Sequence, residues 1–265
     1  MNLPQYETLQ IERDGAQVLV ATLNRPQVLN ALNTQMGREQ LDLWTRLGAE
    51  PGEIRCVVLT GSGERAFCAG ADLKEREGMT DAQWRVQHEI FERAFTALIE
   101  CPLPVIAALN GHAFGGGLEM ALCCDFIYAA KNARFALPEV RLGIMPGGMG
   151  TQNLARAVGE RRAKELILGA RQFNADEARE WGLFNRVCEP GKLAAEALES
   201  ARAIADNAPL SVRQAKKSIH YGLQMDLATG YRFEIEAYDR LVDSEDRVEG
   251  VRAFNEKRKP RFIGR

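Results

Sequence analysis

The chain has 265 residues, of which 46% are hydrophobic, so it can bury an ordinary globular core as one large domain or two small ones. Its 34 basic and 36 acidic residues give a net charge of −2, which excludes a general electrostatic attraction to nucleic acid or to an anionic membrane. An anionic ligand must therefore be bound by local groups.

The six cysteines show no Cys-x-x-Cys spacing, and several of them lie in apolar runs. Reduced, buried thiols are therefore expected, which is typical of a reducing compartment. The N-terminal stretch carries acidic residues in place of an apolar signal-peptide core, and no later apolar run approaches the length of a membrane span. We expect a cytoplasmic protein, although a mature organellar protein would show the same features.

Strand and helix patterns alternate along the first part of the chain. Residues 18–23 form a nearly continuous apolar run with β-branched residues, which predicts a strand covered on both faces. A helix is predicted next because apolar residues recur at helical spacing at Leu32, Met36, Leu43 and Leu47. Residues 56–60 then predict another strand, so the expected fold class is α/β.

A second helix is predicted to begin at Thr80 and Asp81 and to end at Pro102. His88 falls on its apolar stripe, where a histidine more often packs through a hydrogen bond than acts in catalysis, and we interpret His112 in the same way. The sequence has three histidines in all. It lacks the Gly-x-Ser-x-Gly motif of a serine triad and the His-x-x-x-His motif of a zinc site, so neither kind of site is expected.

Two glycine-containing turns follow apolar strands, at residues 67–74 and at residues 110–119. In the second turn, Gly115 to Gly117 stand between a strand-like run and a helical run, so backbone amides are exposed at a helix N-terminus. Such amides can bind an anion or a developing oxyanion. The alternative interpretation is an ordinary tight turn, which is the commoner use of a glycine triplet.

Two glutamates accompany these turns. Glu119 lies just inside the helix that follows the glycine triplet, and Glu139 lies on a loop after the apolar run at residues 126–130. A strand, helix, strand and loop in this order can bring the two carboxylates together, and paired carboxylates suit proton transfer. Taken alone, a glutamate in a first helical turn is often only a match to the helix dipole.

Together these segments resemble the crotonase superfamily, also called the enoyl-CoA hydratase/isomerase superfamily. The resemblance covers nearly the whole chain and rests on Leu23-Asn-Arg-Pro, Phe67-Cys-Ala-Gly-Ala-Asp-Leu, the run from Asn110 to Glu119, Pro138-Glu139, Pro146-Gly-Gly-Met-Gly-Thr-Gln152 and Phe254-Asn-Glu-Lys257. It implies a crotonase-type ββα spiral core over residues 1–191 and an all-helical trimerisation region over residues 192–265. Within the family the chain looks similar to methylglutaconyl-CoA hydratases, where Gly70-Ala-Asp-Leu-Lys-Glu-Arg76 and Glu245-Asp-Arg-Val-Glu-Gly250 recur.

The resemblance also implies an activity and a set of site residues. It implies hydration of a short- or branched-chain trans-2-enoyl-CoA, with Glu119 and Glu139 transferring protons and with the amides of Ala71 and Gly116 as oxyanion donors. Substrate-binding positions that it implies are Ala69, Asp72, Leu73, Lys74, Gly147, Phe254 and Lys257, the last two reaching coenzyme A on a neighbouring subunit. Lys74 has the alternative of a solvated surface charge. No metal and no cofactor beyond the coenzyme A of the substrate is expected.

The chain departs from the family pattern at three places. Met149 and Asn153 stand where a glycine and an arginine are usual, which leaves the shape of the acyl pocket open. Gln27 occupies a place where many members carry a lysine near the coenzyme A phosphates.

Two alternative functions remain: a double-bond isomerase on the same scaffold, and an RNA-binding relative. The helix over residues 32–48 has no basic face, which argues against the second.

The C-terminal part of the chain is predicted to be helical from Lys192 onward. It carries an apolar stripe that a terminal helix cannot bury against itself, formed by Leu227, Tyr231, Ile235, Tyr238 and Leu241. We expect this stripe to contact another subunit, and the family resemblance implies a homotrimer or homohexamer; the alternative is a stripe that packs on its own spiral core.

Overall fold

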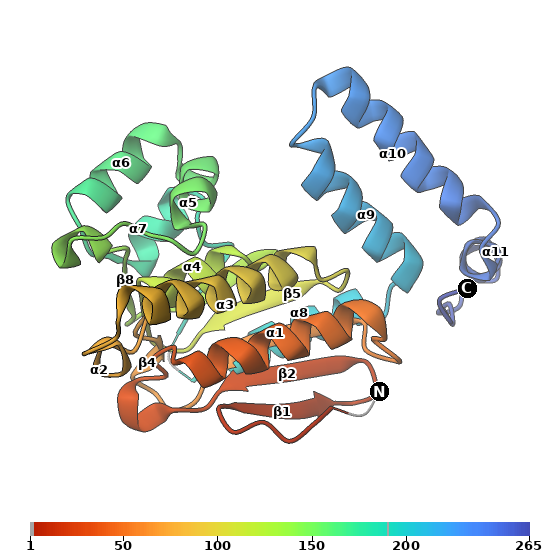
Figure 1. Ribbon diagram of the computed structural model, residues 1–265. Coiled ribbons are helices and arrows are strands. Elements are labelled where there is room, and N and C mark those ends of the chain that lie inside the picture. The colour runs from red at the N-terminus through yellow and green to blue at the C-terminus, as the bar shows by residue number, and fades with distance from the viewer. Residues whose placement is uncertain (1–2, 190) are drawn as a thin grey trace.

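The computed structural model describes residues 3–189 and 191–265 of the chain. It contains two sheets with helices packed around them (Figure 1). The larger sheet has the strand order β1-β2-β3-β5-β7-β10, and the smaller sheet has the order β4-β6-β8-β9. In the larger sheet every neighbouring pair is parallel except β1 with β2, and in the smaller sheet only β8 and β9 pair antiparallel.

Where the sequence predicted a strand or helix, as at residues 18–23, 32–48 and 56–60, the bounds agree to within a few residues. The strands are β1 (Leu9–Asp14), β2 (Val18–Leu23), β3 (Cys56–Gly61), β4 (Ala66–Cys68), β5 (Val105–Leu109), β6 (His112–Phe114), β7 (Phe126–Ala130), β8 (Arg134–Ala136), β9 (Phe173–Asn174) and β10 (Arg186–Cys188). The helices are α1 (Thr34–Ala49), α2 (Leu73–Arg76), α3 (Asp81–Glu100), α4 (Gly116–Leu122), α5 (Gly150–Val158), α6 (Glu160–Leu168), α7 (Ala175–Glu180), α8 (Leu193–Ala205), α9 (Pro209–Gly222), α10 (Leu227–Val242) and α11 (Glu245–Asn255), with short 3-10 turns η1 (Pro26–Val28) and η2 (Glu139–Leu142).

The chain builds both sheets by repeating one unit. β3 joins the larger sheet, β4 joins the smaller sheet, and α2 and α3 follow; β5, β6 and α4 repeat the pattern, and β7 and β8 repeat it again before η2. Each turn of the spiral therefore places a strand–helix junction at the same end of the molecule as the turn before it. This arrangement confirms the predicted ββα spiral.

Two layers of apolar side chains hold the spiral together. The main layer lies between the sheets and helices α1, α3 and α4 and includes Trp44, Phe67 and Phe95. A second layer covers the other face of the larger sheet, where small side chains of α8 pack on strand residues such as Val58 and Ile106. Because α8 packs on the sheet, the helices that stand away from it begin with α9. The division at residue 191 stays a prediction.

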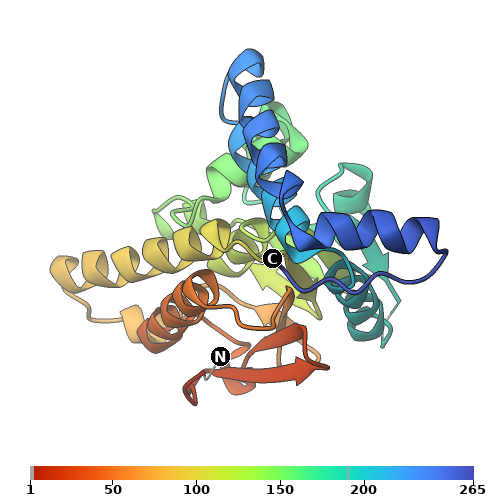
Figure 2. The same ribbon diagram turned by 90° about the vertical axis from the view of Figure 1, so that its right-hand side faces the viewer.

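Helices α9 and α10 form an antiparallel pair that projects from the core, with α11 at its base (Figures 1 and 2). The apolar stripe predicted on α10 is exposed to solvent in the single chain: Leu227 is 70% exposed, Tyr231 and Ile235 are each 59% exposed, and Tyr238 is 66% exposed. These four side chains do not pack on the chain's own core, so that alternative is wrong.

Gly117 lies where the backbone of α4 approaches the backbone of β4 very closely. A Cβ atom on this residue would lie 2.3 Å from the carbonyl oxygen of Cys68, which belongs to β4 and cannot move without its sheet. We expect Gly117→Ala to lower the free energy of unfolding by about 1–3 kcal/mol through overpacking. Urea denaturation measures the effect.

Gly48→Ala is the matched control for this prediction. Its added Cβ would meet only Pro102 Cδ at 3.8 Å, and alanine favours the helix by at most about 1 kcal/mol. Equal stability of the two variants would show that α4 and β4 can separate at little cost, contrary to this description of the core.

Candidate active site

The two glycine turns predicted from the sequence touch each other at one end of the spiral. Gly70 has φ +94° and Gly115 has φ +51°, values that residues other than glycine rarely adopt. A Cβ atom on Gly70 would lie 2.8 Å from the carbonyl oxygen of Phe114 and 3.6 Å from the amide nitrogen of Gly116. Only glycines therefore allow the turn after β4 and the turn after β6 to approach this closely.

The contact leaves two backbone amides without partners. Leu32 donates to the carbonyl of Gly70 over 2.8 Å, and Ala69 and Asp72 donate to the carbonyls of Leu29 and Leu32. Across residues 3–189 and 191–265, neither the amide of Ala71 nor that of Gly116 donates a hydrogen bond. Gly116 is the first residue of α4, where the amides point out of the helix toward the positive end of its dipole. The geometry suits an oxyanion held between the two turns.

Glu119 is held in place by a third glycine segment. It lies in α4, is 4% exposed, and its Oε1 accepts hydrogen bonds from the amides of Gly148 at 2.8 Å and Gly150 at 2.9 Å. Burial raises the pKa of this carboxyl, and the two amides offset part of that effect because they stabilise the anion. Oε2 has no partner within the described chain, so this oxygen is available for proton transfer.

Glu139 is in a different environment. It begins the 3-10 turn η2, is 8% exposed, and neither of its carboxylate oxygens has a hydrogen-bond partner among the described residues. A Cβ atom on Gly115 would lie 2.9 Å from its Oε1, so the carboxyl lies directly against the oxyanion turn. Burial, with a further contribution from the negative charge of Glu119, raises the pKa of Glu139 to about 7.

The turns and the two carboxyls line one cavity of about 910 Å³. Of the predicted site residues, this cavity is lined by Ala69, Ala71, Leu73, Gly116, Glu119, Glu139 and Gly147. Its remaining wall is largely apolar and comes from α3 and from the segment between η2 and α5. A volume of this size is typical of small-molecule sites, which combine an apolar wall with a few polar groups.

Two of the predicted coenzyme A positions lie outside the cavity wall. Asp72 caps α2 by accepting from the amides of Lys74 and Glu75, and it forms an ion pair with Arg25 at 2.9 Å. Lys74 is exposed on the same short helix. In the single chain Asp72 therefore anchors the turn that presents Ala71, and its contact with a nucleotide stays a prediction, as does that of Lys74.

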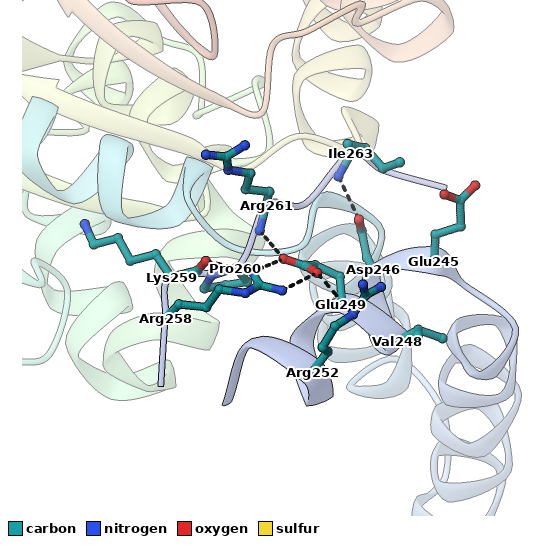
Figure 3. Close-up of a pocket in the computed structure, with 10 residues that line it drawn as sticks. All are labelled: Glu245, Asp246, Val248, Glu249, Arg252, Arg258, Lys259, Pro260, Arg261 and Ile263. Carbon is teal, nitrogen blue, oxygen red and sulfur yellow. Dashed lines mark hydrogen bonds and ion pairs between the residues drawn. The ribbon is translucent and has the colours of Figure 1, made fainter. Parts of the chain in front are cut away.

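Phe254 and Lys257 lie near the C-terminus, and neither residue lines the cavity of its own chain. Phe254 is 84% exposed at the end of α11, and Lys257 adopts φ +53° where the chain turns back along that helix. A second hollow of about 780 Å³ is formed there by α11 and the returning tail (Figure 3). The role of both residues toward a neighbouring subunit stays a prediction.

Two carboxylates fix the returning tail (Figure 3). Glu249 accepts from both terminal nitrogens of Arg258 at 2.7 Å and 3.0 Å and from the amide of Arg261 at 2.8 Å, which lowers the pKa of Glu249 to about 2. Asp246 accepts from the amides of Ile263 and Gly264. The backbone of the tail and the side chain of Arg258 are therefore held against α11.

His112 and His88 lie in different surroundings, and only His88 lines the cavity. His112 accepts a hydrogen bond from the amide of Arg134 at 2.9 Å, as expected for a packing residue. His88 lines the cavity, half-buried, and a Cβ atom on Gly147 would lie 2.5 Å from its Nε2. The apolar stripe of α3 covers the core and also lines the cavity. Helical spacing alone could not show that His88 belongs to the part that lines the cavity.

Within the described ranges, no group of histidine, cysteine and acidic side chains is arranged to hold a metal ion. None of the helices in those ranges is long and apolar enough to cross a membrane. All six cysteines are free thiols, and five of them are buried.

Comparison with known proteins shows the family to which the chain belongs. Residues 13–265 match the sequence profile of the enoyl-CoA hydratase/isomerase family. A short-chain-enoyl-CoA hydratase from Clostridium acetobutylicum is 44% identical over 249 residues, covering 94% of this chain and 95% of the relative. A crotonyl-CoA hydratase from Syntrophomonas wolfei is 39% identical over 260 residues, covering 98% of this chain and 99% of the relative.

The fold agrees with this match. The crystal structure of an enoyl-CoA hydratase from Bacillus anthracis superposes with a TM-score of 0.96 at 42% identity, covering 98% of this chain and 100% of that one. The narrower likeness to methylglutaconyl-CoA hydratases stays a prediction. With the family profile, near full-length relatives and the same fold in agreement, the chain belongs to the enoyl-CoA hydratase/isomerase family, the crotonase superfamily.

Proposed function

We propose that this protein is an enoyl-CoA hydratase, a carbon–oxygen lyase that adds water across the double bond of a short- or branched-chain trans-2-enoyl-CoA. The observation that carries the proposal is the meeting of two buried carboxyls, Glu119 and Glu139, with two unpartnered amides in one cavity. The names of the relatives support the same reaction, since they are short-chain and crotonyl-CoA hydratases.

In the proposed reaction the thioester oxygen lies between the amides of Ala71 and Gly116. Water attacks the β-carbon, and the electron pair of the double bond moves toward the thioester to give an enolate, whose charge the two amides stabilise. Glu119 takes the proton of the water, and Glu139 delivers a proton to the α-carbon. The enzyme is restored when a proton passes from Glu119 back to Glu139. The reaction needs no metal and no redox cofactor.

The different environments of the two carboxyls support this division of roles. Two amides stabilise the anion of Glu119, as suits a base, whereas Glu139 has no such donors and a pKa raised to about 7, as suits an acid near neutral pH. Two titratable groups whose pKa values are pushed apart can divide acid and base work in this way.

The two alternatives have less support. Isomerases of this family typically keep one of the two glutamates, so the presence of both favours hydration. RNA binding would need a basic surface, but α1 packs against α3, its Glu39 is buried, and its Arg46 is paired with Asp42 at 2.7 Å.

A hydration assay over a panel of enoyl-CoA thioesters tests the proposal directly, because hydration removes the absorbance of the conjugated double bond. We expect turnover with short-chain substrates such as crotonyl-CoA. Migration of the double bond without uptake of water would support the isomerase instead, and retention of labelled RNA on a filter at physiological salt would support the RNA-binding relative.

The paired glutamates give the first kinetic prediction. Glu119→Gln and Glu139→Gln should each lower kcat by about 10²–10⁴-fold with little change in KM, because they remove proton transfer and leave the thioester contacts in place. The double variant should be little slower than either single variant. Steady-state kinetics with crotonyl-CoA measure all three; a single variant with near-normal kcat would remove that glutamate from the mechanism.

The pH dependence follows from the raised pKa of Glu139. A carboxyl that must be protonated to act loses activity as the pH rises through its pKa, so kcat/KM should decline above about pH 7. Protonation of Glu119 should cause an acid limb at lower pH, because its two amide donors favour the anion. A profile that stays level to about pH 9 would contradict the assignment of Glu139 as the acid.

The exposed stripe on α10 predicts a homo-oligomer, by family resemblance a trimer or a pair of trimers. An apolar surface of this extent is seldom left in water. Light scattering at micromolar concentration should give the mass of an oligomer for the wild type. Ile235→Asp should lower that mass because it places a charge within the stripe, whereas the exposed neighbour Glu236→Ala should leave it unchanged. A monomeric wild type would exclude the assembly.

A further inference from the structure

Met149 adopts a backbone conformation that is unusual for its residue type. Its φ is +72° and its ψ is 5°, in the left-handed region, and it is the N-cap residue that precedes α5. Its carbonyl oxygen accepts from the amides of Gln152 at 3.1 Å and Asn153 at 2.9 Å, so the helix fixes this conformation. A side chain at such a position costs stability that glycine would avoid. Strain of this kind is concentrated at functional sites, which prompts the question of what the side chain does.

The side chain of Met149 belongs to the cavity. It is half-buried, packs against the main apolar core and lines the cavity that holds Glu119 and Glu139. Its two neighbours in sequence, Gly148 and Gly150, are the residues whose amides hold Glu119 Oε1. The backbone of Met149 is therefore fixed beside the carboxylate of Glu119.

Phe95 forms part of the wall on this side of the cavity. A Cβ atom on Gly148 would lie 2.5 Å from Cε2 of Phe95, so the buried ring of Phe95 lies directly against the glycine segment. The thioester is fixed at the other turn by Ala71 and Gly116, and the reacting carbons must lie between Glu119 and Glu139. An acyl chain that continues past Glu119 therefore meets Phe95 and Met149.

We propose that Met149 sets the length of acyl chain that the cavity accepts, by occupying the space into which the end of a longer chain would extend. This inference rests on the proposed function and assigns its preference for short acyl chains to one residue. Met149 acts here as a specificity-determining residue that takes no part in proton transfer. Glycine at this position would keep the φ of +72° without strain and would open the wall by the length of a thioether side chain.

The test compares Met149→Gly with the wild type on saturated and unsaturated thioesters. Binding is measured by calorimetry with butyryl-CoA and octanoyl-CoA, and turnover is measured with but-2-enoyl-CoA and oct-2-enoyl-CoA. Each methylene newly buried contributes about fourfold to affinity, so the preference for the longer over the shorter ligand should rise by about tenfold or more in both measurements.

Met149→Leu is the matched control, because it keeps an apolar side chain of similar size at the same backbone position. It should retain the wild-type preference. An unchanged ratio of octanoyl-CoA to butyryl-CoA affinity in Met149→Gly, with a wild-type circular dichroism spectrum, would overturn the inference. The affinity ratio is measured without turnover, so it does not depend on the proposed hydration. If the proposed hydration were wrong, no thioester would be hydrated, but the affinity ratio would still shift in Met149→Gly.

Discussion

The close approach of two backbone turns is the constraint on which this site depends. The turn after β4 and the turn after β6 meet at Gly70 and Gly115, where side chains would strike Phe114 and Glu139. Among the described residues the amides of Ala71 and Gly116 have no partner at this contact, whereas the amides of Asp72 and Gly115 donate to the carbonyls of Leu32 and Ala136. The spiral makes the contact possible because successive turns of the chain bring equivalent junctions to the same end. An oxyanion site thus follows from the repeat of the fold and needs no side chain of its own.

The two carboxyls show how one cavity can hold the same functional group in two states. Both are buried, and burial raises the pKa of both. The difference lies in their partners: Glu119 accepts from the amides of Gly148 and Gly150, whereas among the described residues no other residue donates to the carboxyl of Glu139. Leaving a buried carboxyl without donors is costly when it is charged, so the protein stabilises the neutral form of Glu139 at the expense of its anion. Catalytic requirement and folding stability are opposed at this residue.

The sequence was sufficient for several of the main elements and for the centre of the candidate site. Local patterns predicted β2, β3, α1 and α3, and the glycine turns with Glu119 and Glu139 pointed to the cavity in which the structure places them. What it did not predict are contacts between distant segments. The amides of Gly148 and Gly150 donate to a carboxylate about 30 residues earlier, and Arg25 pairs with Asp72 across 47 positions. Such contacts have no periodicity, so local spacing cannot reveal them.

The hydrogen bonds of Glu119 have a stereochemical consequence. Both amides bind the same oxygen, Oε1, so only Oε2 remains to receive a proton from water. A base with a single available oxygen, fixed against a backbone segment, can activate water on only one face of a planar enoyl group. In the proposed reaction two amides from the opposite turns hold the thioester, so the substrate has no equivalent orientation that presents its other face. The hydroxyl group of the product should therefore be formed in one configuration, chosen by which carboxylate oxygen the glycine segment occupies.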